Sequence, residues 1–240
     1  MERVKELRAG EANRRWSFDR RLPLAEQLYD DLRRRIVSLE LPPSHSLSRL
    51  ELSEYYGVSQ TPLRDAIQKL EGEELLEIYP QSKTLVTRID TSLVRETQFL
   101  RTALEVEIVA LLAVDPDKTK LEAAEDAQER LAALSQQDGE FEEFNRLDKE
   151  FHRSLYRAAE MMKLDDLIDA RSGQIDRIRQ LHLKLKDDKK SEQVVDDHNR
   201  ILVALRSSDV ESAKSAMREH LSGTLKRLDA LRACFPDYFD

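Results

Sequence analysis

Cysteine is almost absent from this chain, in which Cys234 is the only one among 240 residues. A single thiol cannot form a disulfide within the chain, and such cysteine usage is typical of a reducing compartment. Long apolar runs are also lacking, since none approaches the roughly 20 residues that cross a bilayer. The N-terminus, Met-Glu-Arg-Val-Lys, has no signal-peptide core. We therefore expect a cytoplasmic protein with no membrane partner.

An excess of basic residues is lacking as well, because the formal net charge is −8. Residues 1–90 have a net charge of −1, so the remaining 150 residues carry −7. This balance excludes a uniformly basic coat for nucleic acid. Any contact with DNA must come from locally placed Arg and Lys side chains, with the acidic part held away from the duplex.

Glycine and proline are scarce, with 6 and 7 residues, and this scarcity favours helices. The length exceeds that of a usual single domain and predicts two domains. An apolar content of 40% is sufficient for a core in each of them. We expect a mainly α protein, apart from a poorly patterned N-terminal arm over residues 1–21.

The most informative stretch runs from Leu52 to Leu70 and predicts two short helices joined by a tight turn at Gly57. Glycine suits the turn because a left-handed backbone costs it little, and Val58 fills the angle between the helices. The apolar residues expected to face a core are Leu50, Leu52, Tyr55 or Tyr56, Leu63, Ile67 and Leu70. This pattern is the outline of a helix-turn-helix.

The second of these helices presents a polar face. Ser59 or Thr61 can cap it, and Pro62 is tolerated in the first turn, where no intrahelical hydrogen bond is donated. The outward residues are Gln60, Thr61, Arg64, Asp65 and Gln68. In a major groove Arg can read guanine and Gln can read adenine. An ordinary helical hairpin with a solvated Arg64 is the simpler alternative.

The residues that follow favour the DNA-binding alternative. Glu77–Ile89 alternates apolar and polar residues about Pro-Gln-Ser-Lys, which predicts a β-hairpin with a basic tip at Lys83. The pattern of Leu22–Leu39 supplies a preceding helix. Three helices and a hairpin in this order make a winged helix. The predicted DNA contacts are Arg33, Arg49, Ser59, Gln60, Thr61, Arg64 and Lys83.

Three consecutive arginines, Arg33, Arg34 and Arg35, lie on the first of these helices. We expect them mostly to face outward, where they either contact phosphates or form an ordinary solvated face.

Beyond Asp90 the sequence predicts only helices. The six expected helices span residues 93–112, 118–134, 140–159, 164–186, 191–205 and 209–234. Short loops between them predict an antiparallel bundle.

Histidines are the second strong signal, and they fall within this predicted bundle. Asp148 and His152 lie four residues apart, so their side chains project from one helix face. His198 and His220 lie on two later helices beside apolar residues. A carboxylate and three imidazoles from three helices can hold a divalent metal ion, zinc in the first place, with nickel or manganese as alternatives. The competing interpretation is that each histidine is a lone packed or surface residue.

Residues 22–89 are similar to the winged-helix domain of the GntR family of bacterial transcription regulators. The resemblance is strongest over Val-Ser-Gln-Thr-Pro-Leu-Arg-Asp-Ala-Ile, residues 58–67. Gln60 stands where family members commonly have Arg, which removes a charge. The connector to the second helix often has Gly where this chain has Leu39 and Ser44, and Gly is frequent where Lys83 stands at the wing tip.

Residues 91–233 resemble the FCD ligand-binding domain of the FadR-type subgroup, which leaves residues 234–240 as a C-terminal tail. Its metal-binding members use four positions that match Asp148, His152, His198 and His220, whereas His45 and His182 match none and are expected at the surface. Four protein ligands leave room for an oxygen of a bound small acid.

Arg101 resembles an arginine that often faces the pocket in this subgroup. Its guanidinium suits a carboxylate, although a salt bridge with Glu105 one turn later is equally expected. Arg177 and Arg179 are weaker candidates for the same role.

The resemblance implies a non-enzymatic homodimer that binds operator DNA and senses a small organic acid at a metal site. Two other interpretations stay open. One is a metal-dependent hydrolase or lyase that uses the same Asp and three His, although no His-Glu-x-x-His motif is present. The other is a DNA-binding protein whose bundle serves only for dimerisation.

Overall fold

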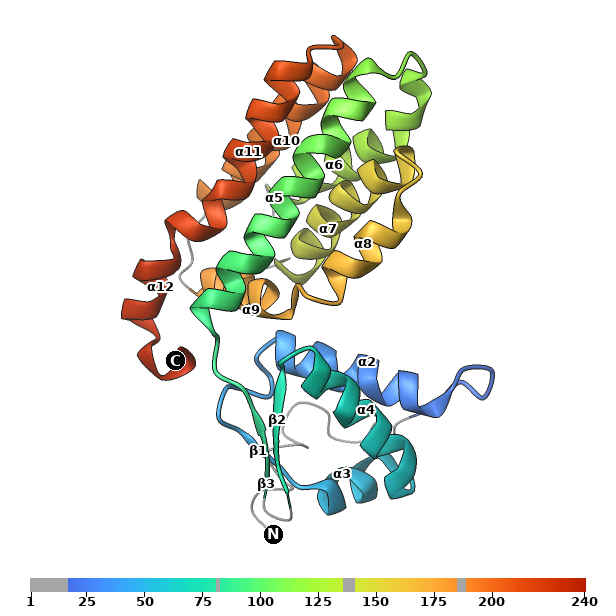
Figure 1. Ribbon diagram of the computed structural model, residues 1–240, viewed down its shortest axis with the longest axis vertical. Helices are drawn as coiled ribbons and strands as arrows, with labels where there is room; N and C mark the ends of the chain where they lie inside the picture. Colours follow the sequence, from blue (N-terminus) through green and yellow to red (C-terminus); the bar gives the residue numbers. More distant parts are fainter. Residues whose placement is uncertain (1–16, 81–82, 136–140, 185–188) are drawn as a thin grey trace. The chain divides into compact units, whose positions relative to one another are not determined.

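The computed structural model describes residues 17–80, 83–135, 141–184 and 189–240 (Figure 1). The first sixteen residues of the expected N-terminal arm, two residues of the hairpin tip and Glu140, the expected start of a helix, lie outside this part of the chain. The chain divides into two compact units. One holds the described residues up to Ile89 together with Asp237–Asp240, and the other holds Asp90–Pro236.

The first unit combines three helices with a small antiparallel sheet. Its elements are α2 (Leu24–Val37), β1 (Ser46–Leu47), α3 (Arg49–Tyr56), α4 (Gln60–Gly72), β2 (Leu76–Tyr79) and β3 (Lys83–Val86). The strand order is β1-β3-β2, and the hairpin register pairs Leu76 with Val86 and Tyr79 with Lys83. The predicted winged helix is therefore confirmed. The short strand β1 was not expected, because two residues are too few to show an alternating pattern.

The turn between α3 and α4 has the expected geometry. Gly57 ends α3 with a left-handed backbone, at a φ of 67°. Leu52 and Tyr56 of α3 are buried, but Leu50 is 62% exposed, so the expectation that Leu50 faces the core was wrong. The buried core of this unit is formed mainly by Leu28, Leu32, Ile36, Leu52, Tyr56, Leu63, Ile67, Leu70 and Val86.

Two residues that replace a frequent glycine of the family adopt left-handed backbones. Leu39 has a φ of 62° and Ser44 a φ of 65°. For an L-residue this conformation costs roughly 1–2 kcal/mol, which explains why glycine is frequent at both positions.

We expect Ser44→Gly to raise the free energy of unfolding of the first unit by about 0.5–1 kcal/mol, because the side chain is exposed and glycine removes the backbone strain. Urea denaturation followed by circular dichroism measures the change. Leu39→Gly is the matched control. It relieves the same strain but deletes a side chain that is only 7% exposed, so it should destabilise the unit. Stabilisation by Leu39→Gly but not by Ser44→Gly would contradict this account of the connector.

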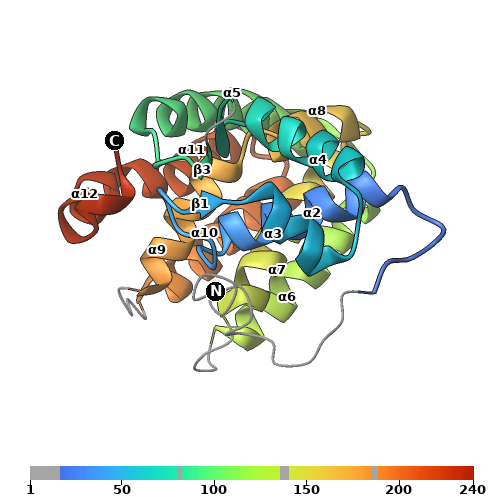
Figure 2. The same ribbon diagram turned by 90° about the horizontal axis from the view of Figure 1, so that it is seen from below.

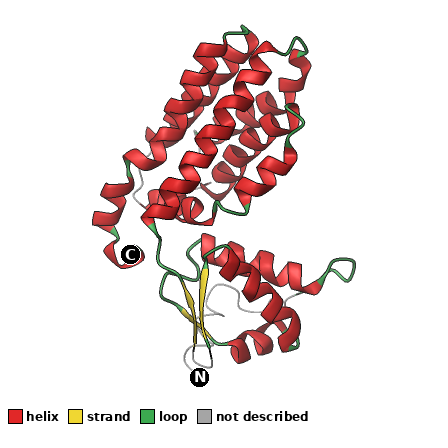
Figure 3. Cartoon of the chain, viewed as in Figure 1, coloured by secondary structure: helices red, strands yellow, loops and turns green. Residues whose placement is uncertain are grey.

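The second unit is a bundle of α-helices (Figures 1 and 3). Its elements are α5 (Thr91–Val114), η1 (Lys118–Leu121), α6 (Glu122–Leu134), α7 (Phe141–Ala158), α8 (Met162–Asp169), α9 (Gly173–Lys184), α10 (Lys189–Arg206), α11 (Val210–Lys226) and α12 (Leu228–Cys234). The short 3-10 helix η2 (Pro236–Tyr238) spans the boundary to the last four residues, which belong to the first unit. Figure 2 shows the chain from below, and α5 and α11 pack against each other. The all-α second domain was correctly predicted. No helix in the described part of the chain is long and apolar enough to span a bilayer.

Two of the six expected helices are broken in the structure. The helix predicted over 164–186 divides into α8 and α9 at Ala170–Ser172, where the Ser172 carbonyl accepts from Asp176 N–H and starts a new helix. The helix predicted over 209–234 divides into α11 and α12 at Arg227. Gly173 directly follows the first break and is a signal that the prediction missed, whereas no glycine or proline stands at Arg227.

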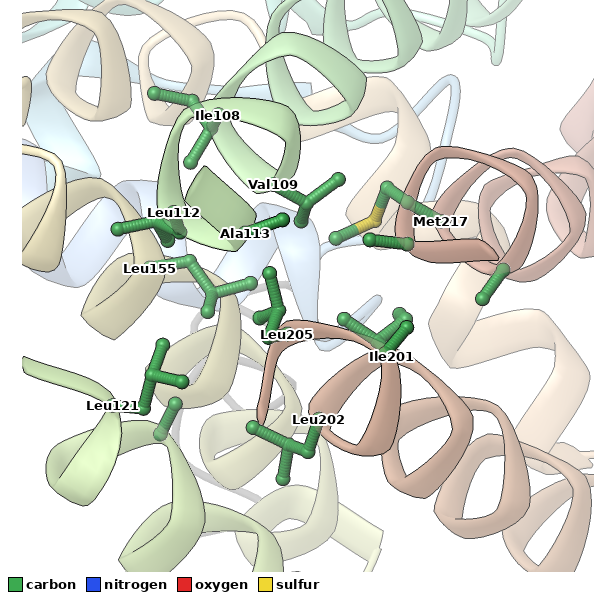
Figure 4. Packing of buried hydrophobic residues seen from close by; sticks show 14 of the residues in the cluster. Ile108, Val109, Leu112, Ala113, Leu121, Leu155, Ile201, Leu202, Leu205 and Met217 are labelled. Atoms are coloured by element: carbon green, nitrogen blue, oxygen red, sulfur yellow. The ribbon is translucent and has the colours of Figure 1, made fainter. Parts of the chain in front are cut away.

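The bundle core is built from α5, α6, α7, α10 and α11. Figure 4 shows Ile201 and Leu205 of α10 facing Val109 of α5, with Met217 of α11 and Leu155 of α7 beside them. All five side chains are at most 2% exposed. This core packs α7, α10 and α11 together, and the same three helices carry the histidines of the predicted metal site.

Candidate functional site

The four predicted metal ligands converge at one place in the bundle. Asp148 and His152 come from α7, His198 from α10 and His220 from α11, and one ligand atom from each lies within 4.8 Å of all the others. The Nε2 atoms of His152 and His220 are 3.1 Å apart, and Asp148 Oδ1 lies 3.5 Å from His198 Nε2. Two imidazole nitrogens bound to one zinc ion lie roughly 2.9–3.4 Å apart, given Zn–N bonds near 2.1 Å. The spacing fits one shared ion.

Helix α7 positions its two ligands through its amphipathic pattern. Phe144, Leu147 and Phe151 bury one stripe of the helix, and the adjacent stripe carries Asp148 and His152. The Phe151 ring also stacks on His198, with ring centroids 3.8 Å apart and planes within 11°. His198 is fully buried, and its Nε2 has no hydrogen-bond partner among the described residues. A buried nitrogen of this kind is costly unless a ligand satisfies it.

Each imidazole has an oxygen close to its Nδ1, and for His198 this pair is a hydrogen bond. The pairs are His152 Nδ1 with Glu105 Oε2 at 2.6 Å, His198 Nδ1 with Gln128 Oε1 at 3.0 Å and His220 Nδ1 with Asp197 Oδ2 at 3.5 Å. Metal-binding histidines usually donate their other ring N–H to such an acceptor, which fixes the tautomer and leaves Nε2 for the ion. Gln128 is itself held, since its amide nitrogen donates to the Val195 carbonyl and to Asn199.

These orienting residues were not identified from the sequence as metal-site residues. Glu105 was considered only as a partner of Arg101, and Gln128 is one of several polar residues of α6 that the sequence does not distinguish from one another. Asp197 directly precedes His198 but serves His220 instead. Only the folded arrangement brings these pairs together.

The electrostatics favour the protonation state that a metal requires. Burial lowers the pKa of His152 and lowers the pKa of His198 well below the usual value. Burial raises the pKa of Glu105, but the Arg101 guanidinium outweighs it and brings that pKa to about 2. Burial likewise raises the pKa of Asp148, but the Arg179 guanidinium outweighs it and lowers that pKa, so Asp148 is ionised. Neutral imidazoles and charged carboxylates are the forms that bind a cation.

These shifts predict how the stability of the metal-free protein depends on pH. The unfolded chain takes up protons on its histidines near their ordinary pKa of about 6.5, whereas folded His152 and His198, whose pKa values are lowered by burial, resist protonation. The free energy of unfolding in chelator should therefore fall as the pH is lowered through about 6.5, and urea titrations between about pH 7.5 and 5 measure it. His198→Gln should flatten the slope, and an equally steep slope in that variant would contradict the assignment.

Two cavities flank the cluster of four ligands. The smaller, of about 80 Å³, is lined by Asp148 and His220, and the larger, of about 230 Å³, by Glu105 and His152. Arg101 and Arg179 line both cavities. A bound cation here would therefore be within reach of a ligand entering from either side.

Arg101 pairs with Glu105 and also stands in the cavity walls. Its Nε donates to Glu105 Oε1 at 2.9 Å, and Glu105 is its only hydrogen-bond partner among the described residues. Arg101 also lines both cavities, and a guanidinium suits a carboxylate ligand.

The other predicted basic residues differ in position. Arg179 lies 3.3 Å from Asp148 Oδ2 and belongs to the cavity wall, whereas Arg177 is fully buried and donates to Gln174. His182 is only 5% exposed and lines the smaller cavity, so the expectation of a surface residue was wrong. His45 is half-buried in the first unit.

The predicted DNA-binding residues of α4 are exposed. Gln60, Thr61 and Arg64 lie in its first two turns, and the Arg64 side chain is 61% exposed with Asp65 3.8 Å away. Ser59 occupies the N-cap position with an extended backbone, but its side chain makes no cap hydrogen bond.

The remaining predicted DNA contacts lie at the sheet and on α2. Arg49 and Lys83 line a groove of about 310 Å³ beside Tyr79. Arg33 donates to Glu73 at 2.9 Å, and its side chain is 14% exposed, so its charge is engaged within the protein. Arg35 is 2% exposed and pairs with Glu40. The expectation that these three arginines mostly face outward holds only for Arg34, whose side chain is 57% exposed, and was wrong for Arg33 and Arg35.

Comparison with known proteins finds a match for each of the two domains. Residues 24–86 match the bacterial regulatory proteins of the gntR family, and residues 96–223 match the FCD domain. An uncharacterized HTH-type transcriptional regulator of Streptomyces ambofaciens is 32% identical over 88% of this chain and 88% of its own length. The HTH-type transcriptional repressor RspR of Escherichia coli is 29% identical over 90% of this chain and 94% of its own.

Among solved structures, Escherichia coli McbR/YncC has a TM-score of 0.73 at 20% sequence identity and covers 89% of this chain, with 99% of its own chain matched. At this identity the likeness concerns the fold. The two named relatives are transcriptional regulators, and this agrees with the winged helix and the helical bundle described above. The chain belongs to the GntR family of bacterial transcription regulators, with an N-terminal helix-turn-helix DNA-binding domain and a C-terminal FCD effector-binding domain.

Proposed function

We propose that this regulator senses a small carboxylic or sugar acid at a divalent metal ion held by Asp148, His152, His198 and His220. The observation that carries the proposal is the convergence of these four ligand atoms within 4.8 Å, with the Nδ1 of every imidazole turned to an oxygen. Three nitrogens and one oxygen suit zinc, and nickel or manganese are alternatives. When bound, the ion would offer open coordination positions to an oxygen of the acid.

The protein's own residues would fix the charge and orientation of that acid. The Nη edge of Arg101 would bind one carboxylate, while Glu105 holds the Nε edge in place. Arg179 would add a second positive charge at the wall of both cavities. This arrangement favours an acid with a carboxylate and a neighbouring oxygen over a neutral ligand of the same size.

The DNA-binding half of the proposal concerns a near-palindromic operator. Two copies of the chain would bind as a homodimer, and α4 of each copy would enter one major-groove half-site. Three exposed apolar side chains on α5, Phe99, Leu111 and Val114, support association of the bundle with a second copy. Binding of the acid would change operator affinity through a coupling of typically about 1–3 kcal/mol.

The test is a fluorescence anisotropy titration of zinc-loaded protein against the DNA upstream of its own gene. We expect binding that is saturable, that has two chains per duplex and that shifts roughly 5- to 150-fold when the right member of a panel of small carboxylic and sugar acids is added. Arg101→Lys keeps the charge but loses the fork, and it should reduce the response to the acid while leaving basal DNA binding unchanged. Operator binding that no acid of the panel alters would contradict the sensing function.

A further inference from the structure

The last four residues of the chain belong to the DNA-binding unit rather than to the bundle. Phe239 forms a parallel β-bridge with Ile89, the residue that follows the wing. Ile89 N–H donates to the Tyr238 carbonyl at 2.8 Å, and Asp240 N–H donates to the Ile89 carbonyl at 3.3 Å. Phe239 is 2% exposed and Ile89 is fully buried. Two backbone hydrogen bonds and a buried aromatic ring therefore dock this C-terminal tail.

The helix that leads to the C-terminal tail begins at the wall of the sensor cavity. Arg227 closes α11, precedes α12 directly and lines the smaller cavity together with His220. It also donates to Gln193, another residue of that wall, at 3.0 Å. Leu228 and Leu231 of α12 are at most 1% exposed, so α12 is anchored in the bundle. Figure 3 shows it as a separate short helix after α11.

The other chain connection between the two units also leads from this cavity to Ile89. The side chain of Asp90 accepts from the backbone N–H groups of Ser92 and Leu93 and thereby caps α5. The same helix carries Arg101 and Glu105 in the cavity walls. One connection thus leaves from α5, which lines the cavity, and the other from α12, whose N-cap residue Arg227 lines it; both reach Ile89.

We propose that the C-terminal tail, Asp237–Asp240, provides a second connection between the sensor and the DNA-binding unit. Arg227 is a positioning residue at the end of this connection that lies at the cavity. A single connection lets the two units rotate about a few backbone bonds. A second connection joined to the first restricts that rotation, so a shift of α11 or α12 at the cavity is passed to the residue after the wing. The inference rests on the proposed function, since it describes how the state of the sensor cavity reaches the DNA.

The experiment compares the full chain, Phe239→Ala and a chain that ends at Pro236. Asp237→Asn is the matched control, because Asp237 is exposed and its change leaves the backbone pairing intact. Operator affinity is measured for chelator-stripped protein and again after addition of zinc, which serves as the probe. We expect wild type and Asp237→Asn to change affinity roughly fivefold or more on addition of zinc. In both tail variants the ratio of operator affinities with and without zinc should fall toward one. The operator affinity of the stripped variants should stay within about twofold of stripped wild type.

Hydrogen exchange of the Ile89 amide gives a readout that needs no DNA. The amide should exchange at least about tenfold faster in the chain that ends at Pro236, because its acceptor, the Tyr238 carbonyl, is gone. A full zinc response in both tail variants, or unchanged exchange at Ile89, would overturn the role of the tail while leaving the sensing function intact. Absence of a zinc response in wild type that has taken up zinc would also overturn the inference. Failure of wild type to take up zinc would instead refute the proposed function, and the inference with it.

Discussion

Replacing His198 by alanine is expected to strip the metal ion from the protein while the winged helix stays folded. His198 is fully buried, and its Nε2 faces the other ligands with no alternative partner among the described residues. Loss of an orienting residue around a metal typically costs about 10–100-fold in affinity, and loss of a ligand should cost more. We therefore expect at least a roughly 100-fold loss of zinc affinity. Metal analysis of protein purified without an affinity tag measures occupancy, and a competing chelator measures affinity.

Gln128→Ala provides the graded comparison. The side-chain oxygen of Gln128 lies 3.0 Å from Nδ1 of His198. Gln128 is not itself a proposed metal ligand. Its loss should lower zinc affinity by about 10–100-fold, less than the loss of His198 itself. His45→Ala, at a half-buried histidine of the first unit, should change nothing. Equal occupancy in His198→Ala and wild type would remove His198 from the site.

Arg64→Ala is expected to weaken operator binding by roughly 5- to 150-fold and to blur sequence preference at one position of each half-site. Arg64 lies in the second turn of α4 with a side chain that is 61% exposed, and its nearest carboxylate, Asp65, is 3.8 Å away at the surface. An arginine that reads guanine through both arms contributes about 1–3 kcal/mol of discrimination. Anisotropy titrations against the operator and against single-base variants measure both effects.

Arg130→Ala is a charge-matched control in the other unit, where Arg130 is also about half exposed. It changes the net charge of the chain by the same amount, so it separates loss of a specific contact from loss of general attraction to DNA. Arg33→Ala should have a smaller effect than Arg64→Ala, because Arg33 is engaged with Glu73. Equal affinities for wild type and Arg64→Ala at several salt concentrations would exclude Arg64 from the interface.

Much of the fold could be predicted because its signals are local. Gly57 marks the turn of the helix-turn-helix, the alternation over residues 77–89 marks the wing, and the apolar stripes mark the bundle helices. What escaped prediction depends on tertiary contacts. Strand β1 exists only because β3 offers it a partner, and the break at Arg227 has no breaking residue. Leu50 is apolar, yet it lies on the face of α3 that points away from the core.

The candidate metal site likewise combines local features that could be predicted with tertiary contacts that could not. Spacing placed Asp148 and His152 on one helix face, and apolar neighbours indicated that His198 and His220 point into the same bundle. The family resemblance matched all four positions, and the structure brings them together. Glu105, Gln128 and Asp197 carry no sequence signal, because each acquires its role from a histidine on another helix. Arg35 was misplaced for a related reason. A buried guanidinium is tolerated only where partners such as Glu40 surround it, and sequence alone does not show them.

The most direct test of a cation-centred sensor is anomalous scattering from crystals of the full chain, with data collected on both sides of the zinc absorption edge. We predict one strong anomalous peak per chain, about 2.0–2.2 Å from Nε2 of His152, His198 and His220 and from one oxygen of Asp148. The nickel and manganese edges would identify either alternative in the same way. Crystals grown with zinc that give no peak between these four side chains would contradict the account.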